Sequence, residues 1–321
     1  MFDIASTLGT QLTDQTRRAF EYGKKQTPEG GRAIFNSNPT NKYTQVFNSA
    51  VVDQPASRTA DGGVFYLVSP VAGDSLTLTQ YKVTISMEVT EMEMFFDQYS
   101  ITPRLLSMSQ GIGTGLTQAI ELDTQMLIKN GGSASYTDRD GNTISCLAAD
   151  GENIFANAHT INGGSGTYDN LDATAFGQTG LEIHLELFRK FLNHDGQRQN
   201  KTPTAIYSTK KASLLRLINE YAVSMGQPET TLLGNNTYQG RFRHIALEYL
   251  DTDTSGANDA ATDDYWGLCI PHGENMKLEI SKAPELMAPE KVLNTNNWLI
   301  KGQAWYTVGV YEPTDITLAQ A

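Results

Sequence analysis

The chain has 321 residues, a length that allows one large domain or two ordinary domains around a sizeable core. It carries 24 Lys and Arg against 36 Asp and Glu, so its net charge is 24 − 36 = −12. This charge argues against a basic nucleic-acid binder, whose phosphate contacts need clustered Lys and Arg. Charged residues make up only 19% of a sequence rich in Thr, Asn, Ser and Gly, which is typical of a β-rich chain with many turns.

The N-terminal segment is predicted to be a polar arm. Ile4, Leu8 and Leu12 have helical spacing but follow no basic head or continuous apolar run, so we predict no signal peptide and expect a soluble protein made in the cytoplasm. No stretch reaches the roughly 18 consecutive apolar residues of a membrane span. Residues 22–43 offer little apolar surface to offset the entropy of ordering. We therefore expect neighbouring copies to hold this arm, as in a subunit built for a lattice.

A long antiparallel hairpin is predicted next. Residues 43–52 and 64–70 have the pattern of two strands around a polar loop at 53–63. Residues 76–89 alternate apolar and polar side chains, apart from one slip near Gln80. A hairpin of this length is marginal unless it packs on something, and its simplest partner is another subunit.

Two helices are predicted to follow the hairpin. The first covers residues 90–99, with Thr90 as N-cap and acidic residues in the first turn. The second begins near Thr102 and Pro103, continues as an apolar stripe on steps of three and four, and ends at Asn130. Three glycines interrupt it, each costing about 1 kcal/mol relative to alanine, and both a close helix crossing and a bend are consistent with them. These are Gly111, Gly113 and Gly115.

The rest of the chain predicts an α/β region and a returning strand. Asp140 and Gly141 form the turn of a short hairpin over 136–147. The further elements, in chain order, are a helix at 181–194, a buried strand at 204–208, a helix capped by Ser208 or Thr209, strands at 241–249 and 264–270, and a long alternating strand at 296–312. The fold class predicted from this order is α+β.

No constellation of residues predicts a cofactor or a metal. The glycines of GIGTGL at 111–116 lack the preceding strand and the Lys-Ser/Thr pair of a phosphate loop. Asp251, Asp253 and Asp259 have the spacing of the early positions of a calcium loop, but Thr262 stands where a bidentate Glu is needed. A solvated loop tip is therefore the preferred interpretation, with calcium binding as the alternative.

The histidines and cysteines also lack the spacing of a catalytic site. None of the five histidines forms an HExxH or H-x3-H pair. His184 alternates with Glu182 and Glu186 and is expected at a helix surface. Cys146 and Cys269 are far apart and predict free, partly buried thiols. We expect no enzyme activity and no cofactor, although a site assembled from distant segments stays open.

The order of the parts resembles the Hong Kong 97 type coat fold of tailed-phage major capsid proteins. Three stretches are similar to Mu-like major head proteins: GENIFANAH at 151–159, NLDATAF at 170–176 and LFRKFLNHDGQRQNKTPTAIYSTKKASLLRLI at 187–218. The resemblance implies an N-terminal arm at 1–43, an extended loop at 44–89, a peripheral domain at 90–147 with its spine helix at 101–130, an axial domain at 148–285, and a return strand of the peripheral domain at 286–321.

The same resemblance implies a function. It implies a major capsid protein that self-assembles through pentamers and hexamers into the icosahedral head of a tailed phage virion, enclosing double-stranded DNA. A portal and, in some relatives, scaffolding or decoration proteins are the implied partners. The acidic charge fits a wall that leaves the DNA free to slide. Because the sequence starts at Met1, we expect a separate scaffolding protein or none, rather than an N-terminal piece removed on maturation.

Contacts between subunits are expected to be non-covalent. Some relatives crosslink their subunits covalently through a Lys–Asn isopeptide bond, which needs a lysine in the extended loop. Lys82 is the only lysine within 44–89, and it lies on a predicted strand rather than at the tip. Charges of the arm and of the loop tip are the expected contacts, individually weak and effective by number. These are Arg17, Arg18, Lys24, Arg32, Arg58 and Asp61.

Three other functions are weighed against the phage head. An encapsulin-type shell has the same fold and encloses enzymes instead of a genome, so its cargo would distinguish it. A secreted β-rich binding module would need the signal peptide that the sequence does not predict. A hydrolase would show a pocket where carboxylates or histidines converge with shifted pKa values.

Overall fold

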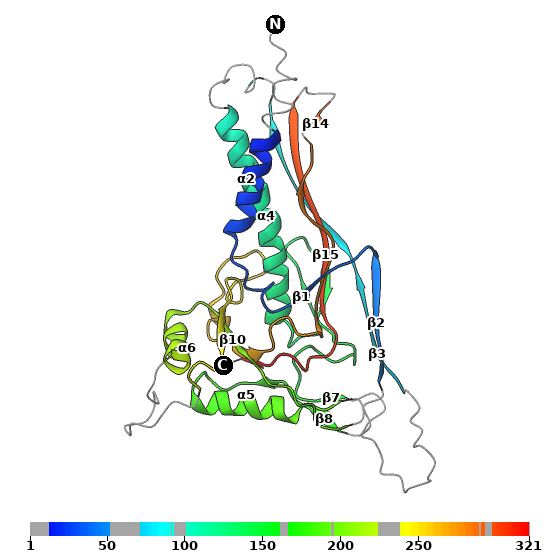
Figure 1. The fold of residues 1–321 in the computed structure, drawn as a ribbon, viewed down its shortest axis with the longest axis vertical. Coiled ribbons are helices and arrows are strands. Elements are labelled where there is room, and N and C mark those ends of the chain that lie inside the picture. The colour runs from blue at the N-terminus through cyan, green and yellow to red at the C-terminus, as the bar shows by residue number, and fades with distance from the viewer. Residues whose placement is uncertain are drawn as a thin grey trace, which may run out of the picture.

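The structure is a computed structural model. It describes residues 13–51, 71–90, 92, 101–160, 166–193, 196–223, 238–288, 290–292 and 297–320. Figure 1 shows an elongated molecule in which a long helix-and-sheet part extends from a wider α/β base. The helix-and-sheet part contains α2 (Thr13–Gln26) and α4 (Ile101–Lys129), and the base contains α5 (Gln178–Lys190) and α6 (Ala212–Val223).

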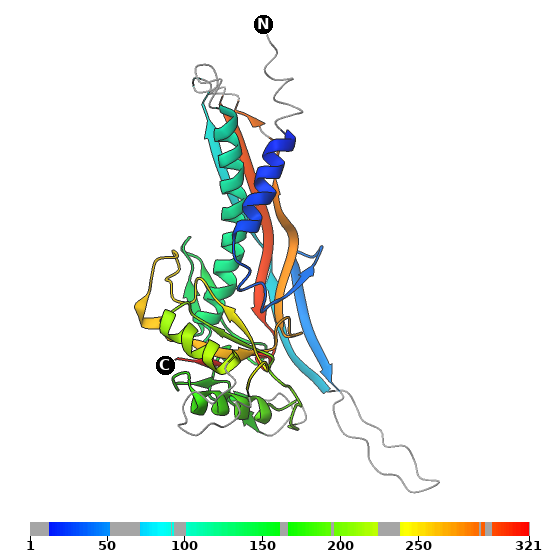
Figure 2. The same cartoon turned by 60° about the vertical axis from the view of Figure 1, so that its left-hand side comes forward.

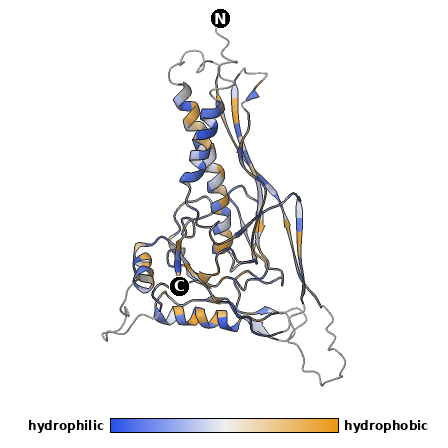
Figure 3. Ribbon diagram, viewed as in Figure 1, coloured by the Kyte–Doolittle hydropathy of each residue, from blue (hydrophilic) through white to orange (hydrophobic). Residues whose placement is uncertain are grey.

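A long sheet runs beside α4. Its central strand is β15 (Trp298–Val310), which pairs antiparallel with β4 (Tyr81–Val89) on one side and with β13 (Met276–Leu286) on the other. β1 (Asn36–Pro39) adds to β13 in parallel, and β14 (Glu290–Lys291) pairs with the start of β15. The helix expected at 101–130 and the strand expected at 296–312 are therefore present as α4 and β15, and Figure 3 shows apolar and polar residues interspersed along α4.

The base is built on a second sheet. Its strand order is β11 (Arg243–Ala246), β10 (Ala205–Ser208), β12 (Trp266–Cys269), β16 (Leu318–Ala319) and β9 (Leu171–Asp172). All residues of β10 and β12 are buried, which confirms the buried strand predicted at 204–208. A second core of aromatic and aliphatic side chains joins this sheet to α5 and α6. Three small elements complete the base: the hairpin β5 (Ser135–Thr137) with β6 (Thr143–Ser145), the hairpin β7 (His159–Thr160) with β8 (Thr167–Tyr168), and the 3-10 helix η2 (Ala260–Thr262).

The predicted long hairpin is a two-stranded ribbon that leaves the long sheet. β2 (Thr44–Val51) pairs antiparallel with β3 (Val71–Thr79), and the chain then continues directly into β4. Gln80 stands at this junction, where its backbone N–H donates to the Tyr43 carbonyl (2.8 Å) and its side chain donates to the Glu279 carbonyl (3.1 Å). The slip in the alternation at Gln80 therefore marks the change from ribbon to sheet. The predicted loop at 53–63, the strand at 64–70 and nearly all of the helix at 90–99 lie outside the described residues.

The expectation that the arm has no core within its own chain is wrong for residues 13–39. Helix α2 lies along α4 in both Figure 1 and Figure 2. Phe20, Ile34 and Phe35 are buried in the main core. The sequence concealed this packing because the helices meet through glycines: a Cβ on Gly23 would stand 2.1 Å from the Gln110 carbonyl oxygen.

The three glycines of α4 face different neighbours. A Cβ on Gly113 would lie 2.3 Å from the Phe20 carbonyl oxygen of α2, a separation that real Cβ atoms do not adopt. Gly111 and Gly115 instead face flexible side-chain ends of β4, at 3.4 Å from Met87 Cε and 3.2 Å from Ile85 Cδ1. Of the two explanations left open by the sequence, a close helix crossing accounts for Gly113.

Two predicted helix ends in the base are wrong. Helix α5 ends at Lys190 instead of 194. Helix α6 begins at Ala212, and the Leu215 N–H donates to the Lys211 carbonyl, so neither Ser208 nor Thr209 caps it. The Ser208 hydroxyl donates to the Thr209 carbonyl, and the Thr209 hydroxyl donates to that of Asp263. Backbone carbonyls outside α6 thus occupy the side chains that were expected to cap the helix.

Candidate assembly surfaces

The outward side of α2 presents unpaired cations. Its inward seam consists of Thr16, Phe20 and Gly23, which are buried at the i, i+4 and i+7 positions of a helix stripe, and the seam continues to the buried Thr27 directly after the helix. Arg17, Arg18, Tyr22 and Lys25 point away from that seam and are exposed, Tyr22 by 59%. We call these four residues the basic face. Among the described residues, none of the three cations has an ion-pair partner, and the acidic Asp14 and Glu21 line the same hollow as the basic face.

The basic face belongs to a segment whose charge is opposite to that of the rest of the chain. Residues 13–42 contain six Lys and Arg and three Asp and Glu, a net charge of 6 − 3 = +3. The remaining residues therefore carry −12 − 3 = −15. Opposite potentials on two parts of one chain favour association between copies and set their orientation.

Two of the predicted arm contacts are engaged within the chain. Lys24 pairs with Glu21 (3.1 Å) and lies over the Phe20 ring, 5.5 Å from its centroid. The Arg32 Nε donates to the Glu121 carboxylate at 2.6 Å. Glu121 is only 1% exposed and also accepts the Gly31 N–H at 2.6 Å. Arg32 thus fastens the arm to α4, while Arg58 and Asp61 lie outside the described residues.

The acidic loop that follows β11 is closed by its own hydrogen bonds. Asp253 accepts the backbone N–H of Ser255 (2.8 Å) and of Ala257 (2.9 Å), and the Ser255 hydroxyl donates to it at 2.6 Å, which lowers the pKa of the Asp253 carboxyl. Asp259 pairs with Lys129 of α4 at 2.8 Å, and the pKa of Asp259 is lowered by this contact. The Asp251 carbonyl accepts the Asp259 N–H. Within the described part of the chain, no three His, Cys, Asp or Glu side chains gather in an arrangement that could hold a metal ion.

His184 is in the core, not at the helix surface where it was expected. Its ring is fully buried against Trp266, with centroids 4.4 Å apart. Nδ1 lies 2.8 Å from the Thr317 hydroxyl oxygen, and Nε2 has no hydrogen-bond partner. Leu181 and Phe188, three residues before and four after His184, are also buried on this helix. Helical spacing from these apolar neighbours was the signal that could have placed His184 inward.

We expect acid to destabilise the protein through His184. Burial lowers the pKa of His184 from 6.5 to about 4. The unfolded histidine takes up a proton as the pH falls below 6.5, whereas the folded one stays neutral until about 4, so stability falls across this window. The loss amounts to about 2 kcal/mol at pH 5. Urea denaturation of the protein and of a His184→Gln variant at neutral pH and at pH 5 measures it, since the carboxylates common to both cancel. Parallel losses in the two proteins would contradict the assignment.

Cys146, Cys269 and Asp123 also have shifted pKa values because they are buried. Burial raises the pKa of the Cys146 thiol to about 12 and that of Cys269 higher still, and both thiols are free. Burial also raises the pKa of Asp123, although the hydroxyls of Tyr306 (2.6 Å) and Tyr81 (3.1 Å) donate to this carboxylate and oppose the rise. These contacts tie α4 to the long sheet, which is a structural role.

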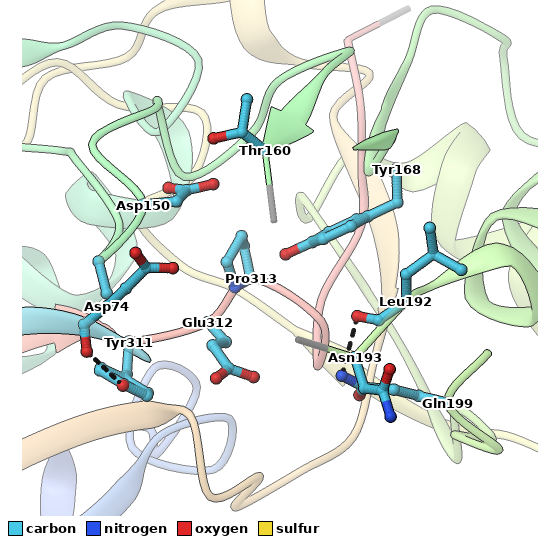
Figure 4. Close-up of a pocket in the computed structure, with 11 residues that line it drawn as sticks. Asp74, Asp150, Thr160, Tyr168, Leu192, Asn193, Gln199, Tyr311, Glu312 and Pro313 are labelled. Carbon is cyan, nitrogen blue, oxygen red and sulfur yellow. Dashed lines mark hydrogen bonds between the residues drawn. The ribbon is translucent and has the colours of Figure 1, made fainter. Parts of the chain in front are cut away.

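Two wider hollows flank α2, and a small cavity lies near the ribbon. The cavity has a volume of about 20 Å³, room for roughly one water molecule. Figure 4 shows Asp74, Asp150, Tyr168 and Glu312 around it. A cavity of this size admits no organic substrate. No described helix is long and apolar enough to cross a membrane.

Comparison with known proteins identifies the fold. No protein-family model and no curated protein sequence matches the chain. Solved structures do match. The virus-like particle from Pyrococcus furiosus superposes with a TM-score of 0.53 at 8% identity, covering 95% of this chain and 98% of that one. The capsid of Myoviridae phage XM1 has a TM-score of 0.51 at 8% identity, covering 91% and 90%. The capsid of a native GTA particle has a TM-score of 0.52 at 8% identity, covering 90% and 89%.

The chain has the Hong Kong 97 type capsid fold. The predicted α+β class and coat fold are thereby confirmed. At these identities the matches establish the capsid fold and not one branch of it, so the likeness to Mu-like head proteins stays a prediction. In this capsid fold the basic face of α2 is exposed and the β2–β3 ribbon leaves the long sheet.

Proposed function

We propose that this protein is the major capsid protein of a tailed phage, a non-enzymatic subunit that assembles into an icosahedral head around double-stranded DNA. The observation that carries the proposal is the superposition of about nine-tenths of the chain on subunits of assembled particles. The similarity of residues 151–159, 170–176 and 187–218 to Mu-like head proteins favours a phage. The head would be built from copies of this chain, with a portal and with scaffolding or decoration proteins as further partners.

The second candidate is an encapsulin-type compartment. The match to the virus-like particle from Pyrococcus furiosus covers 98% of that chain, which favours a shell of similar subunit size. Nucleic acid recovered from purified native particles supports the phage head. Particles that hold an enzyme and no genome support the compartment.

In this proposal the extended loop is residues 44–89: β2 and β3 leave the long sheet as the ribbon, whereas residues 81–89 pair with β15 within that sheet. A two-stranded ribbon is marginal on its own. Near the long sheet, the ribbon is supported by its own chain: the ring centroids of Phe47 and Tyr311 are 6.4 Å apart, and the Lys277 ammonium lies over the Phe47 ring. Farther along the ribbon, a neighbouring subunit would provide the support. The arm at 1–43, the peripheral domain at 90–147, the axial domain at 148–285 and the return strand at 286–321 keep their proposed boundaries.

Electron microscopy of the purified chain tests the proposal. We expect closed shells or capsomer rings from the full-length protein. A double variant, Arg17→Glu with Arg18→Glu, should reduce assembly strongly because it reverses the basic face without touching buried residues. Arg216→Glu on α6 is the control, since it makes the same kind of charge reversal at an exposed site outside the arm. An unchanged denaturation midpoint shows that each variant folds.

The outcomes distinguish the shell proposal from the proposed role of the basic face. Dispersed monomers from the full-length chain under every assembly condition would contradict the shell proposal. Normal shells from the double variant would remove the basic face from the assembly contacts and leave the shell proposal standing. Deletion of the whole arm is a poorer test, because α2 and β1 belong to the core and sheet of their own subunit.

A further inference from the structure

Strand β4 is an open edge of the long sheet. On one side it pairs with β15 through nine consecutive residue pairs, from Tyr81 with Tyr306 to Val89 with Trp298, without a register shift. In the described part of the chain, no strand pairs with its other side. Such a side presents a row of backbone N–H and C=O groups with which another strand can pair. We call this row the β4 edge.

The opposite edge of the sheet is protected, whereas the β4 edge is not. β1 covers β13 over Lys277–Ile280, and beyond that point β13 has two register shifts and contains Pro284. Irregular register and proline, which has no N–H, are common means by which an edge avoids pairing. β4 contains neither. The β4 edge therefore has the regular geometry that strand addition requires.

The side chains of β4 are complementary to a second copy of themselves. When two copies lie antiparallel with their Ile85 residues opposite each other, each of the nine residues has a counterpart. Lys82 then stands opposite the partner's Glu88, and Thr84 stands opposite the partner's Ser86. Because the arrangement has two-fold symmetry, each of these pairs forms twice. A shift by two residues in either direction would separate Lys82 from Glu88, so the charges specify this register.

Both charges lack an ionic partner among the described residues of their own subunit. Lys82 is exposed, and its ammonium lies over the Trp305 ring, 5.9 Å from the centroid. Glu88 is exposed and accepts a hydrogen bond from Asn297 Nδ2 at 2.6 Å, an uncharged donor. Opposite charges directly across two paired strands attract, and like charges repel. Each end of β4 is therefore suited to an ion of the opposite sign.

We propose that two copies of this chain join through antiparallel pairing of their β4 edges, centred on Ile85, so that their long sheets become one continuous sheet. In a shell this pairing would be a two-fold contact between subunits, and that role rests on the proposed function. The pairing itself needs only two folded subunits.

The apolar face of β4 would also gain cover from the pairing. Val83, Ile85 and Met87 are partly buried against the core of their own subunit. In the pair, Val83 would lie beside the partner's Met87 and Ile85 beside the partner's Ile85, which would remove further apolar surface from water.

Helix α4 leaves room for the second subunit. It contacts β13, β15 and β4 and is thus centred on the middle strand, β15. Three strand spacings, about 14 Å, would separate β15 from the partner's β15. Helices pack at roughly 8–10 Å between axes, so both copies of α4 fit on the same face of the joined sheet.

Cysteine crosslinking of the full-length chain tests the register. Thr84 and Ser86 are exposed, and the native Cys146 and Cys269 are buried. Co-expressed Thr84→Cys and Ser86→Cys chains should form disulfide-linked dimers under mild oxidation by diamide, because their cysteines stand opposite each other. Either chain alone places its two cysteines diagonally, about 7–8 Å apart, which is too far for a disulfide without backbone movement. Crosslinking no greater in the mixture than in either chain alone would overturn the pairing.

Charge exchange tests the ion pairs. Lys82→Glu sets two carboxylates against each other at both ends of the pairing, and Glu88→Lys sets two ammonium groups there. Each change, added to the cysteine chains, should slow crosslinking about tenfold. The double variant restores opposite charges across the two subunits and should regain the original rate, while denaturation midpoints check that each variant folds. A double variant as slow as the single ones would show that these charges act within their own subunit, and would overturn the pairing.

These results are separable from the test of the shell. Shells or capsomer rings without crosslinks would contradict the β4 pairing and leave the shell proposal standing. Crosslinked dimers from a chain that never forms shells would support the pairing and contradict the shell proposal. Dispersed monomers without crosslinks would contradict both.

Discussion

Replacement of Gly113 by leucine should destabilise the protein by about 3 kcal/mol, the upper end of the usual cost of overpacking. The new Cβ would stand 2.3 Å from the Phe20 carbonyl oxygen and 3.2 Å from the Lys24 amide nitrogen. Both are backbone atoms of α2, which cannot rotate away as a side chain can. The two helices would have to separate, and Phe20 would lose its cover. Chemical denaturation followed by circular dichroism measures the change.

Gly111→Leu is the matched control in the same helix, and Gly111→Ala is its milder form. A Cβ at this position would approach only Met87 Cε, at 3.4 Å, an ordinary contact with the free end of a flexible side chain. Alanine also favours the helix over glycine by up to about 1 kcal/mol. The alanine variant should be as stable as the native chain or more so. A Gly113→Leu protein that matched Gly111→Leu in stability would show that α2 does not cross α4 at Gly113.

Removal of the Glu121 side chain should cost about 3 kcal/mol or more, because it breaks a buried ion pair from one side. Glu121→Ala leaves the Arg32 guanidinium and the Gly31 N–H without their acceptor, and each was bonded at 2.6 Å. Gln125 also loses its 3.3 Å contact with this carboxylate. Denaturation gives the total loss. Limited proteolysis should show early cleavage within residues 27–35, the segment that this pair holds on α4.

Glu29→Ala provides the comparison for this pair. Glu29 contacts the same Arg32 at 3.5 Å, but its side chain is 73% exposed. Exposed pairs contribute little, so the loss should stay within about 0.5 kcal/mol. If the two substitutions cost the same, burial of Glu121 would not be what anchors the arm.

These two contacts bear on assembly because they position the basic face. The Gly113 crossing and the Arg32–Glu121 pair both attach α2 and the segment after it to α4. A subunit that lost either contact would present Arg17 and Arg18 from a displaced helix. Variants at Gly113 or Glu121 are therefore expected to impair shell formation indirectly, in contrast to the direct effect of the charge reversal at Arg17 and Arg18.

The candidate surface could be predicted only in part from the sequence. The cation-rich composition of the arm indicated a charged contact, and Arg17 and Arg18 are exposed and unpaired in the described structure. The same composition could not separate them from Arg32, whose partner Glu121 lies 89 residues away in the chain. The acidic loop shows the same limit, since Asp259 pairs with Lys129 across 130 residues. Spacing along a sequence does not reveal such partners.

Periodicity and turn chemistry by themselves determined the α+β class, the long helix with its apolar stripe, the buried strand at 204–208 and the short hairpin around Gly141. Each of these follows from local rules, because the side-chain period records which face is buried and a positive φ requires a residue such as glycine. The junction between ribbon and sheet at Gln80 was also visible in the sequence, as a break in the alternation of apolar and polar residues.

Only the tertiary structure decided how the arm is held, which way His184 points and what the glycines of α4 face. A glycine contact has no side chain to leave a pattern, and helix α2 reaches α4 through backbone atoms at Gly23 and Gly113. The hydrogen bonds of His159, Asp150 and Asn170 were likewise hidden, because they join these residues to one another and to a carbonyl from residue 313. Interactions of this kind are determined by distances between remote segments, and those distances exist only once the chain has folded.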